Sequence, residues 1–346
     1  MDRRDFLGRA LTLAAGGSGG IGVPLVDLVG ESTPHVPARV RADDVAEVED
    51  ATAQIASWDL QRGGHLAADQ GAALLRWSLE LRSRAINGDL VGRLDRTIAY
   101  LADRTAWATY DSGRHDQARR QFQLGLAVAA DARDVNVRAQ LFCDMANQAV
   151  YLRQPNEALR MADAAAAPGL VPQLRSAVHG VMAEAYAAMG RQKGAQVELT
   201  RAEDAFAGPT TGTAPVWLNT FRTEAGMHHA IGYAGYLLAR ATGGTGTTAA
   251  LEHLGHAVAG LGDDRSRAAM FATLRMATLH LGQGEGDPGT GARLARTVLP
   301  RLTGVRSTRM ISEVQALRFA LARHESRSEM ADLGRDLDQA IAQFAW

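Results

Sequence analysis

Four histidines are the residues of this sequence best suited to chemistry. His228 and His229 are adjacent, and His253 and His256 stand three positions apart in a predicted helix. Histidines at positions i and i+3 share one helix face and together can chelate a divalent metal. A metal needs further ligands, and no Glu-x-x-His framework accompanies either pair. We therefore expect surface or inter-helix histidines and no bound metal.

No other arrangement of residues indicates catalysis. We expect no nucleophile elbow, which needs a Gly-x-Ser-x-Gly turn between a strand and a helix. The acidic pairs Asp43–Asp44 and Asp263–Asp264 stand at predicted helix starts, where capping and the helix dipole explain them. Cys143 is the only cysteine, which excludes an internal disulfide, and its apolar segment predicts a core position. These observations predict a protein that is not an enzyme.

Two glycine patterns formally match a dinucleotide-binding fingerprint, at residues 17–22 and 244–249. That fingerprint binds a pyrophosphate only between a strand and the amino end of a helix. Pro24 follows the first pattern at once, and neither pattern follows a predicted strand. Both are expected to be loops, so the sequence predicts no cofactor.

Composition favours helices packed on helices. Apolar residues make up 46% of the chain but aromatic residues only 5%, because alanine supplies much of the apolar content. Small residues let helices approach closely, and period-two alternation typical of strands is missing after residue 40. The net charge is −1, with acidic residues interspersed among the basic ones, whereas a protein that binds nucleic acid directly normally shows a basic excess. We expect an all-α protein that does not bind nucleic acid by itself.

A weak internal repeat organises the chain. Ala118, Ala158 and Ala195 each stand early in a helix, after a preceding helix and a tight polar turn. The offsets between them are 40 residues (158 − 118) and 37 residues (195 − 158), close to the tetratricopeptide period of about 34. The pattern predicts a tetratricopeptide-like solenoid of helical hairpins, an α-α superhelix.

The repeat places helices and turns over most of the sequence. We expect a flexible N-terminal segment at residues 1–40, followed by a repeat array with C-terminal capping helices at residues 41–346. The predicted helices are a first from residue 43, then 70–84 and 90–110, three hairpins turning at 113, 153–155 and 190, one from Pro215 through 237, then 251–261, 270–281 and 292–299, and a last pair within 305–346.

First helices of stacked pairs line the inner wall of a solenoid, and this wall usually binds another chain. Amide side chains there can bond an extended peptide, although the aromatic residues have packing between repeats as an alternative role. The predicted partner-binding residues on this concave face are Arg104, Trp107, Asp144, Asn147, Gln148, Tyr151, Glu184 and Tyr186.

The first residues resemble a twin-arginine export signal. Arg3 and Arg4 precede Phe6 and Leu7, and a short apolar stretch follows at residues 10–15. A small-x-small cleavage site is missing before residue 34, and the apolar stretch is far below the ~20 residues of a membrane span. A linker or docking segment is therefore the first interpretation, with export as the alternative, and no transmembrane span is expected.

Six short segments carry a resemblance to a known family: residues 107–115, 118–122, 144–152, 184–190, 201–206 and 305–309. Together they resemble the tetratricopeptide-like sensor region of actinobacterial transcription regulators of the Xre helix-turn-helix class, over approximately residues 40–340. In that family an Arg-Arg-x-Phe-Leu segment commonly links the DNA-binding head to the repeats, and here the segment stands at residues 3–7 without a head.

The resemblance implies a regulatory protein whose repeats bind a peptide or protein partner in the control of transcription. Three origins stay open: a stand-alone binding protein, a regulator whose reading frame begins too late, and an exported relative whose head was replaced by a signal. We expect a cytoplasmic protein and leave open that it is a homodimer; the alternative is an extracytoplasmic scaffold exported by the twin-arginine route.

Overall fold

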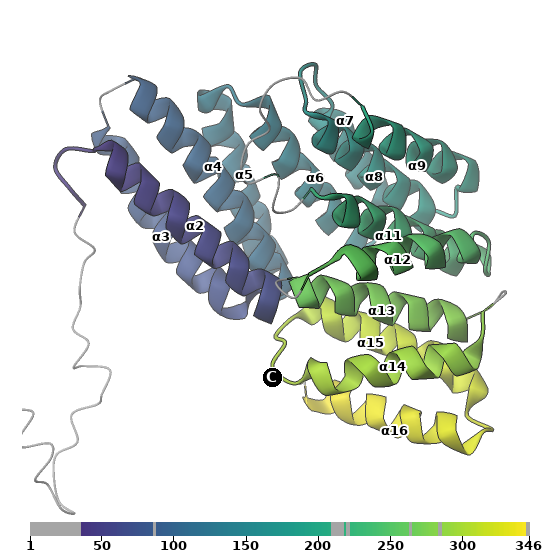
Figure 1. Ribbon diagram of the computed structural model, residues 1–346. Helices are drawn as coiled ribbons and strands as arrows, with labels where there is room; N and C mark the ends of the chain where they lie inside the picture. Colours follow the sequence, from purple (N-terminus) through teal and green to yellow (C-terminus); the bar gives the residue numbers. More distant parts are fainter. Residues whose placement is uncertain are drawn as a thin grey trace, which may run out of the picture. The chain divides into compact units, whose positions relative to one another are not determined.

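The computed structural model describes residues 36–85, 88–208, 218, 222–262, 265–282 and 286–343. Within these residues the chain is helical and contains no strand, which confirms the all-α prediction (Figure 1).

The chain divides into two units, residues 1–37 and residues 38–346, and the features described below belong to the second unit. The predicted export motif at residues 3–7 and the glycine pattern at residues 17–22 lie outside the described residues.

Fourteen α-helices are described, and they form consecutive pairs in which a first helix packs against the second helix that follows it. The first helices are α2 (Ala42–Arg62), α4 (Gly88–Asp111), α6 (Val135–Tyr151), α8 (Pro172–Ala188), α11 (Glu224–Thr242), α13 (Ser266–Leu281) and α15 (Thr308–Leu321). The second helices are α3 (Gly64–Arg84), α5 (His115–Ala132), α7 (Pro155–Ala165), α9 (Gln192–Phe206), α12 (Thr247–Gly260), α14 (Pro288–Leu302) and α16 (Ser328–Gln343), and the short 3-10 helix η3 (Ala322–His324) joins α15 to α16.

The first helices also pack against one another. Each first helix contacts the next first helix along the chain, from α2 through α15. Helix α13 additionally contacts α2, although the two are separated by more than 200 residues of sequence (266 − 62). The first helices are thus brought together inside the unit, where side chains from distant segments meet.

The predicted turns at residues 113, 153–155 and 190 share one geometry. Gly113, Arg153 and Gly190 adopt left-handed backbone conformations, with φ of 84°, 60° and 68°. The next residue of each turn donates its backbone N–H to a carbonyl five positions earlier, at 3.1, 2.8 and 2.9 Å. This pattern is the Schellman motif that ends helices. The same geometry recurs at Gly243 and Gly244 before α12, a fourth turn of this kind.

Small residues set the spacing within a pair. A Cβ on Gly232 of α11 would lie 2.7 Å from Leu254 Cγ of α12, and one on Gly235 would lie 2.8 Å from Ala250 Cβ. Ala118, Ala158 and Ala195, the repeated alanines, are buried to within 1% of full burial. The helices therefore approach at positions where larger side chains would collide.

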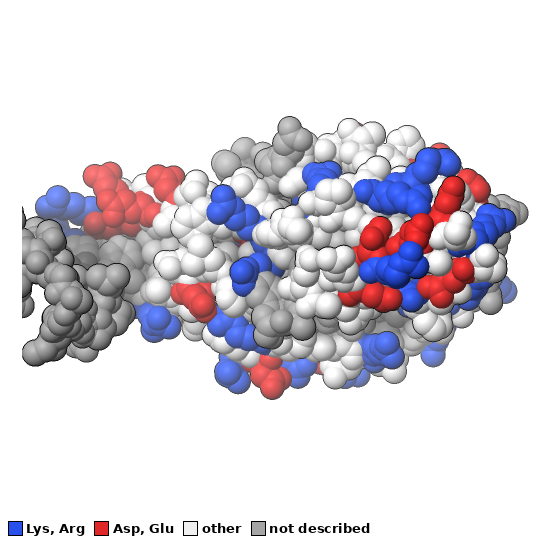
Figure 2. Space-filling model, turned by 90° about the horizontal axis from the view of Figure 1, so that it is seen from below, with Lys and Arg blue, Asp and Glu red and all other residues white. Residues whose placement is uncertain are grey.

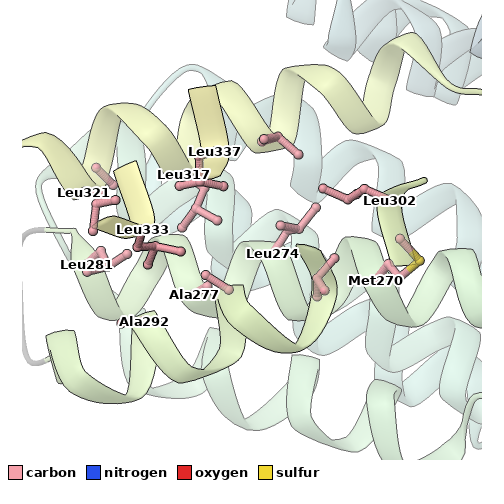
Figure 3. Packing of buried hydrophobic residues seen from close by; sticks show 14 of the residues in the cluster. Met270, Leu274, Ala277, Leu281, Ala292, Leu302, Leu317, Leu321, Leu333 and Leu337 are labelled. Carbon is pink, nitrogen blue, oxygen red and sulfur yellow. The ribbon is translucent and has the colours of Figure 1, made fainter. Parts of the chain in front are cut away.

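The last helices enclose a conventional apolar core. Side chains from α13, α14, α15 and α16 meet there, including Leu274, Leu281, Leu317, Leu333 and Leu337 (Figure 3). Each of these leucines is fully buried. This cluster holds α13 and α15 in place, and both helices contribute to the site described below.

Several helix starts differ from the predicted ones. Helices α12, α13 and α14 begin at Thr247, Ser266 and Pro288, each four residues before the predicted 251, 270 and 292. Helix α3 begins at Gly64 rather than at residue 70, because Gly63 alone, at φ 95°, makes the break after α2. The start predicted at Pro215 lies outside the described residues, and α11 begins at Glu224, where the Thr223 hydroxyl accepts the backbone N–H of Gly226 at 3.2 Å.

On the face seen in Figure 2, neither basic nor acidic side chains form a continuous patch of one charge. Basic and acidic side chains are intermixed there, separated by uncharged residues. This distribution agrees with the near-neutral net charge of −1.

Candidate functional site

A cavity of about 200 Å³ lies among the first helices. All seven first helices contribute to its wall, and none of the second helices does. Its lining is rich in arginine, carboxylate and aromatic side chains. The polar and aromatic lining residues are Asp59, Arg104, Trp107, Gln140, Asp144, Asn147, Glu184, Arg222, His229, Tyr233, Arg265, Arg267, Phe271, Arg275 and Arg309.

One buried ionic network joins α4 to α6. Arg104 bonds the carboxylate of Asp103 and donates to Asp144 Oδ2 at 2.5 Å. Gln140 also donates to Asp144 Oδ2, at 2.8 Å, and its own amide oxygen accepts two hydrogen bonds from Arg222 at 3.0 and 3.1 Å. Burial raises the pKa of Asp103 to about 7, with Arg104 opposing the shift.

A second network centres on Asp111 at the end of α4. The Asp111 carboxylate accepts from Arg267 at 2.8 Å, from the Ser307 hydroxyl at 2.8 Å and from the backbone N–H of Gly64 at 3.1 Å. Arg267 also pairs with Asp59 at 3.1 Å. One buried carboxylate thereby joins α4 to α3, to α13 and to the residue that caps α15.

A third network lies between α11, α13 and α15. Arg275 donates to Glu313 at 2.8 Å, and Tyr236 donates to the same carboxylate at 3.0 Å. The Arg275 guanidinium stands 3.8 Å from the centre of the Tyr233 ring, a cation–π contact. Burial, with the positive charge of Arg275, lowers the pKa of His229 to about 3, so this imidazole is neutral at ordinary pH.

Arg309 is held by aromatic rings rather than by hydrogen bonds. Its guanidinium carbon lies 4.9, 5.1 and 5.0 Å from the ring centres of Trp107, Tyr110 and Phe271. The closest carboxylate oxygen, Oδ1 of Asp111, is 3.7 Å away. Within the described chain this guanidinium has no hydrogen-bond partner, although its side chain is only 15% exposed.

Two carboxylates of the wall keep an oxygen without a partner. Within the described residues, Oε2 of Glu184 and Oδ1 of Asp59 are buried and accept no hydrogen bond. Burial raises the pKa of Glu184 to about 8, with Arg275, Arg222 and Arg309 opposing the shift. Burial also raises the pKa of Asp59. Unsatisfied buried polar atoms in a cavity are typical of a site that a ligand completes.

Five of the eight residues predicted for partner binding line this cavity: Arg104, Trp107, Asp144, Asn147 and Glu184. The other three serve contacts within the protein.

Gln148 donates to the His115 carbonyl at 3.1 Å, and the Tyr151 hydroxyl bonds the Ser312 hydroxyl at 2.9 Å. The Tyr186 ring covers Gly194 so closely that a Cβ there would lie 2.9 Å from it. The structure therefore separates these three from the cavity.

The cavity residues that the sequence did not reveal come mostly from later helices. Arg267, Phe271 and Arg275 stand four positions apart on one face of α13, a helix whose other residues are mainly apolar. Charged residues at helical spacing in an apolar helix were a usable signal of a polar interior. Arg309 and Arg222 carry no such local signal.

Comparison with known proteins gives no further guidance: no protein-family model, no curated protein and no solved structure matches the chain. Over the described residues, no helix combines the length and the apolarity that crossing a membrane would require.

The predicted histidine pairs do approach one another. The His228 ring lies 5.1 Å from that of His253 and 5.0 Å from that of His256, and the Nδ1 atoms of His228 and His253 are 2.9 Å apart. No group of three or more His, Cys, Asp or Glu side chains in the described part of the chain is arranged to hold a metal. His229 points elsewhere, to the cavity.

Cys143 is fully buried, as its sequence context predicted, and burial raises the pKa of its thiol to about 12. A thiol with so high a pKa does not act as a nucleophile at neutral pH.

Proposed function

We propose that this protein is a non-enzymatic regulator whose helices form a tetratricopeptide-like solenoid, closed by the C-terminal helices, that binds a short peptide. Two features support the solenoid: the same left-handed turn recurs at residues 113, 153 and 190, and consecutive first helices pack side by side. In solenoids of helical pairs, the first helices form the inner binding wall.

The observation that carries the proposal is the composition of the cavity wall. All seven first helices contribute residues to this wall, and no second helix does. Its mixture of arginines, amides, carboxylates and aromatic rings offers both hydrogen bonds and apolar contacts. Among the described residues, the lining includes no Ser, Thr, Cys or Lys side chain, so hydroxyl, thiol and amine nucleophiles of these types are missing from it.

The size of the cavity favours a ligand that inserts the end of a peptide over one that presents the surface of a folded protein. A dry cavity of about 150 Å³ holds one benzene molecule. A cavity of about 200 Å³ therefore accommodates a group the size of one amino-acid residue. The partner would insert a terminal residue, and the rest of its chain would leave through the open side.

The proposed regulatory role rests on the fact that all seven first helices contribute to one cavity wall. A ligand in the cavity touches seven helices at once, so binding favours any arrangement of the helices that fits it best. By the family resemblance, the regulated process is transcription. In this proposal, the binding of a partner or of a DNA-binding module depends on the arrangement of the helices.

Binding is tested with mixtures of N-acetylated tripeptides, from which retained species are identified by mass spectrometry and titrated by calorimetry. Asn147→Ala removes a polar group of the wall and is expected to weaken binding about fivefold, since one hydrogen bond contributes about 1 kcal/mol. Asn156→Ala is the matched control, because Asn156 is exposed on α7, away from the cavity. Retention of no tripeptide, or equal weakening by both variants, would reject the proposal.

A further inference from the structure

Among the described residues of the cavity wall, Arg309 is the arginine that makes no hydrogen bond. Its five N–H donors have no acceptor within the described chain, and the closest carboxylate oxygen is 3.7 Å away. A guanidinium so sheltered from water destabilises the protein when its N–H donors make no hydrogen bond. Since Arg309 lines the cavity, a ligand there can supply the missing acceptors.

The other arginines of the wall make hydrogen bonds within the protein, and Arg265 donates to the Thr223 hydroxyl at 2.9 Å. Arg104, Arg267 and Arg275 each have a carboxylate oxygen within 2.8 Å, from Asp144, Asp111 and Glu313 respectively. Arg222 has only the neutral amide oxygen of Gln140 within hydrogen-bond distance, with Asp144 at 3.6 Å. Within the described chain, the guanidinium N–H donors that lack an acceptor are therefore concentrated at Arg309.

The aromatic rings around Arg309 hold the guanidinium in a fixed orientation. Trp107, Tyr110 and Phe271 surround it at 4.9–5.1 Å from ring centre to guanidinium carbon. Because aromatic contacts engage the guanidinium without occupying its N–H groups, its donors stay available. Such a planar fork matches the two oxygens of a carboxylate.

We propose that the cavity recognises a free carboxylate through Arg309, and that this carboxylate is the C-terminus of the bound peptide. The inference rests on the proposed peptide-binding function and specifies which end of the peptide enters. Beside the charged groups the wall is apolar at Leu60, Ala177, Val181 and Ala230, which suits the side chain of one terminal residue.

Glu184 lines the same cavity and can also bond a carboxylate there. The charged groups that face it are Asp144 from α6, Arg222 before α11, Arg275 from α13 and Arg309 from α15. Burial raises its pKa to about 8, so at neutral pH it carries a proton that it can donate to a carboxylate oxygen. A bound carboxylate further favours the protonated form, because two neighbouring carboxylates repel when both are ionised.

The test compares two mixtures of N-acetylated tripeptides, one with free C-terminal carboxylates and one with C-terminal amides, on the full chain at pH 7. Retention of the free acids alone supports the inference. Equal retention of both mixtures refutes it and leaves the peptide-binding function intact, whereas retention of neither refutes the function itself. Retention of amides restricted to sequences with Asp or Glu assigns the carboxylate to a side chain and rejects the C-terminal source.

Arg309→Gln is expected to weaken binding of the retained free acids at least tenfold, because a charge-assisted pair of hydrogen bonds is lost. Arg335→Gln is the matched control, since its side chain on α16 is 73% exposed. Unchanged affinity in a folded Arg309→Gln variant contradicts the inference.

If Arg309→Gln fails to fold, the inference is tested by measuring the affinity of the native chain for the free acids as a function of pH. Affinity of the native chain for free acids is expected to fall as pH rises above about 8, where Glu184 loses its proton. Glu184→Gln cannot ionise and is expected to keep its affinity to pH 9. A native affinity that does not change between pH 7 and pH 9, or the same fall in both proteins, would overturn the inference.

Discussion

First and second helices pack against each other through small residues, yet they bury different side chains. Within the described chain, every buried Asp, Glu or Arg except Glu198 lies on a first helix. The second helices bury mainly alanine, leucine and valine, as in α14 with Ala292, Ala295 and Val298. Within a pair, the second helix therefore buries mainly apolar side chains, whereas the first helix also buries charged side chains in the shared interior.

This division has an energetic consequence. Buried ion pairs rarely stabilise a fold beyond what apolar residues of similar volume would achieve, but removing one member of a pair is strongly destabilising. Substitutions on first helices should therefore cost more than chemically similar substitutions on second helices. Three experiments test this comparison, from the largest expected effect to the smallest.

Asp111→Ala is expected to lower the free energy of unfolding by about 3–5 kcal/mol, because it leaves buried Arg267 with Asp59 alone and removes the acceptor of the Ser307 hydroxyl and the Gly64 N–H. The residue accepts from Arg267 and Ser307, each at 2.8 Å, and from the Gly64 backbone. Urea denaturation monitored by circular dichroism measures the loss. Asp332→Ala on second helix α16, whose side chain is 61% exposed in an ion pair with Arg335, should cost below about 0.5 kcal/mol. Equal losses in the two variants would break the comparison.

Gly232→Ala tests the packing between a first and a second helix. A Cβ there would lie 2.7 Å from Leu254 Cγ and 3.0 Å from the Leu254 backbone nitrogen, so overpacking should cost about 1–3 kcal/mol. At Gly255, on the second helix of the same pair, a Cβ meets no atom within 4 Å. Gly255→Ala should stabilise by up to about 1 kcal/mol through helix propensity. Thermal unfolding reports both, and shifts of the same sign would contradict the argument.

Glu157→Gln probes a charge on the second helix α7. Glu157 pairs with Arg160 one turn later, and the two side chains are 36% and 69% exposed. The stability change should stay below about 0.5 kcal/mol and shrink as sodium chloride is raised, since exposed pairs are screened. A loss above about 1 kcal/mol in urea denaturation would show that second helices also depend on their charges.

The sequence predicted the local features of this molecule well. Turns at Gly113, Arg153 and Gly190 follow from polar residues and glycine after apolar helical runs, and each is present with left-handed geometry. The burial of Cys143 follows from its apolar neighbours. These features depend on residues within a few positions of one another, which a single sequence displays directly.

The cavity could be predicted only in part, because its wall joins segments far apart in sequence. Trp107 and Asn147 belong to the clearest repeats, and both were placed on the inner wall from helical spacing. Arg309 reaches the same cavity from α15, where the repeat is weak. Tyr151 satisfies the same spacing but bonds Ser312, 161 residues away, a contact that no local pattern encodes.

The ties between the early and late helices bear on how the protein is made. Ser307 bonds Asp111 across 196 residues, and the backbone N–H of Arg306 bonds the carbonyl of Arg62 at 2.8 Å. An ordinary repeat array gains stability pair by pair as the ribosome releases it. Here Asp111 receives its last hydrogen-bond partner, Ser307, only when nearly the whole chain has been made, and removing α15 would take Arg309 from a wall to which all seven first helices contribute.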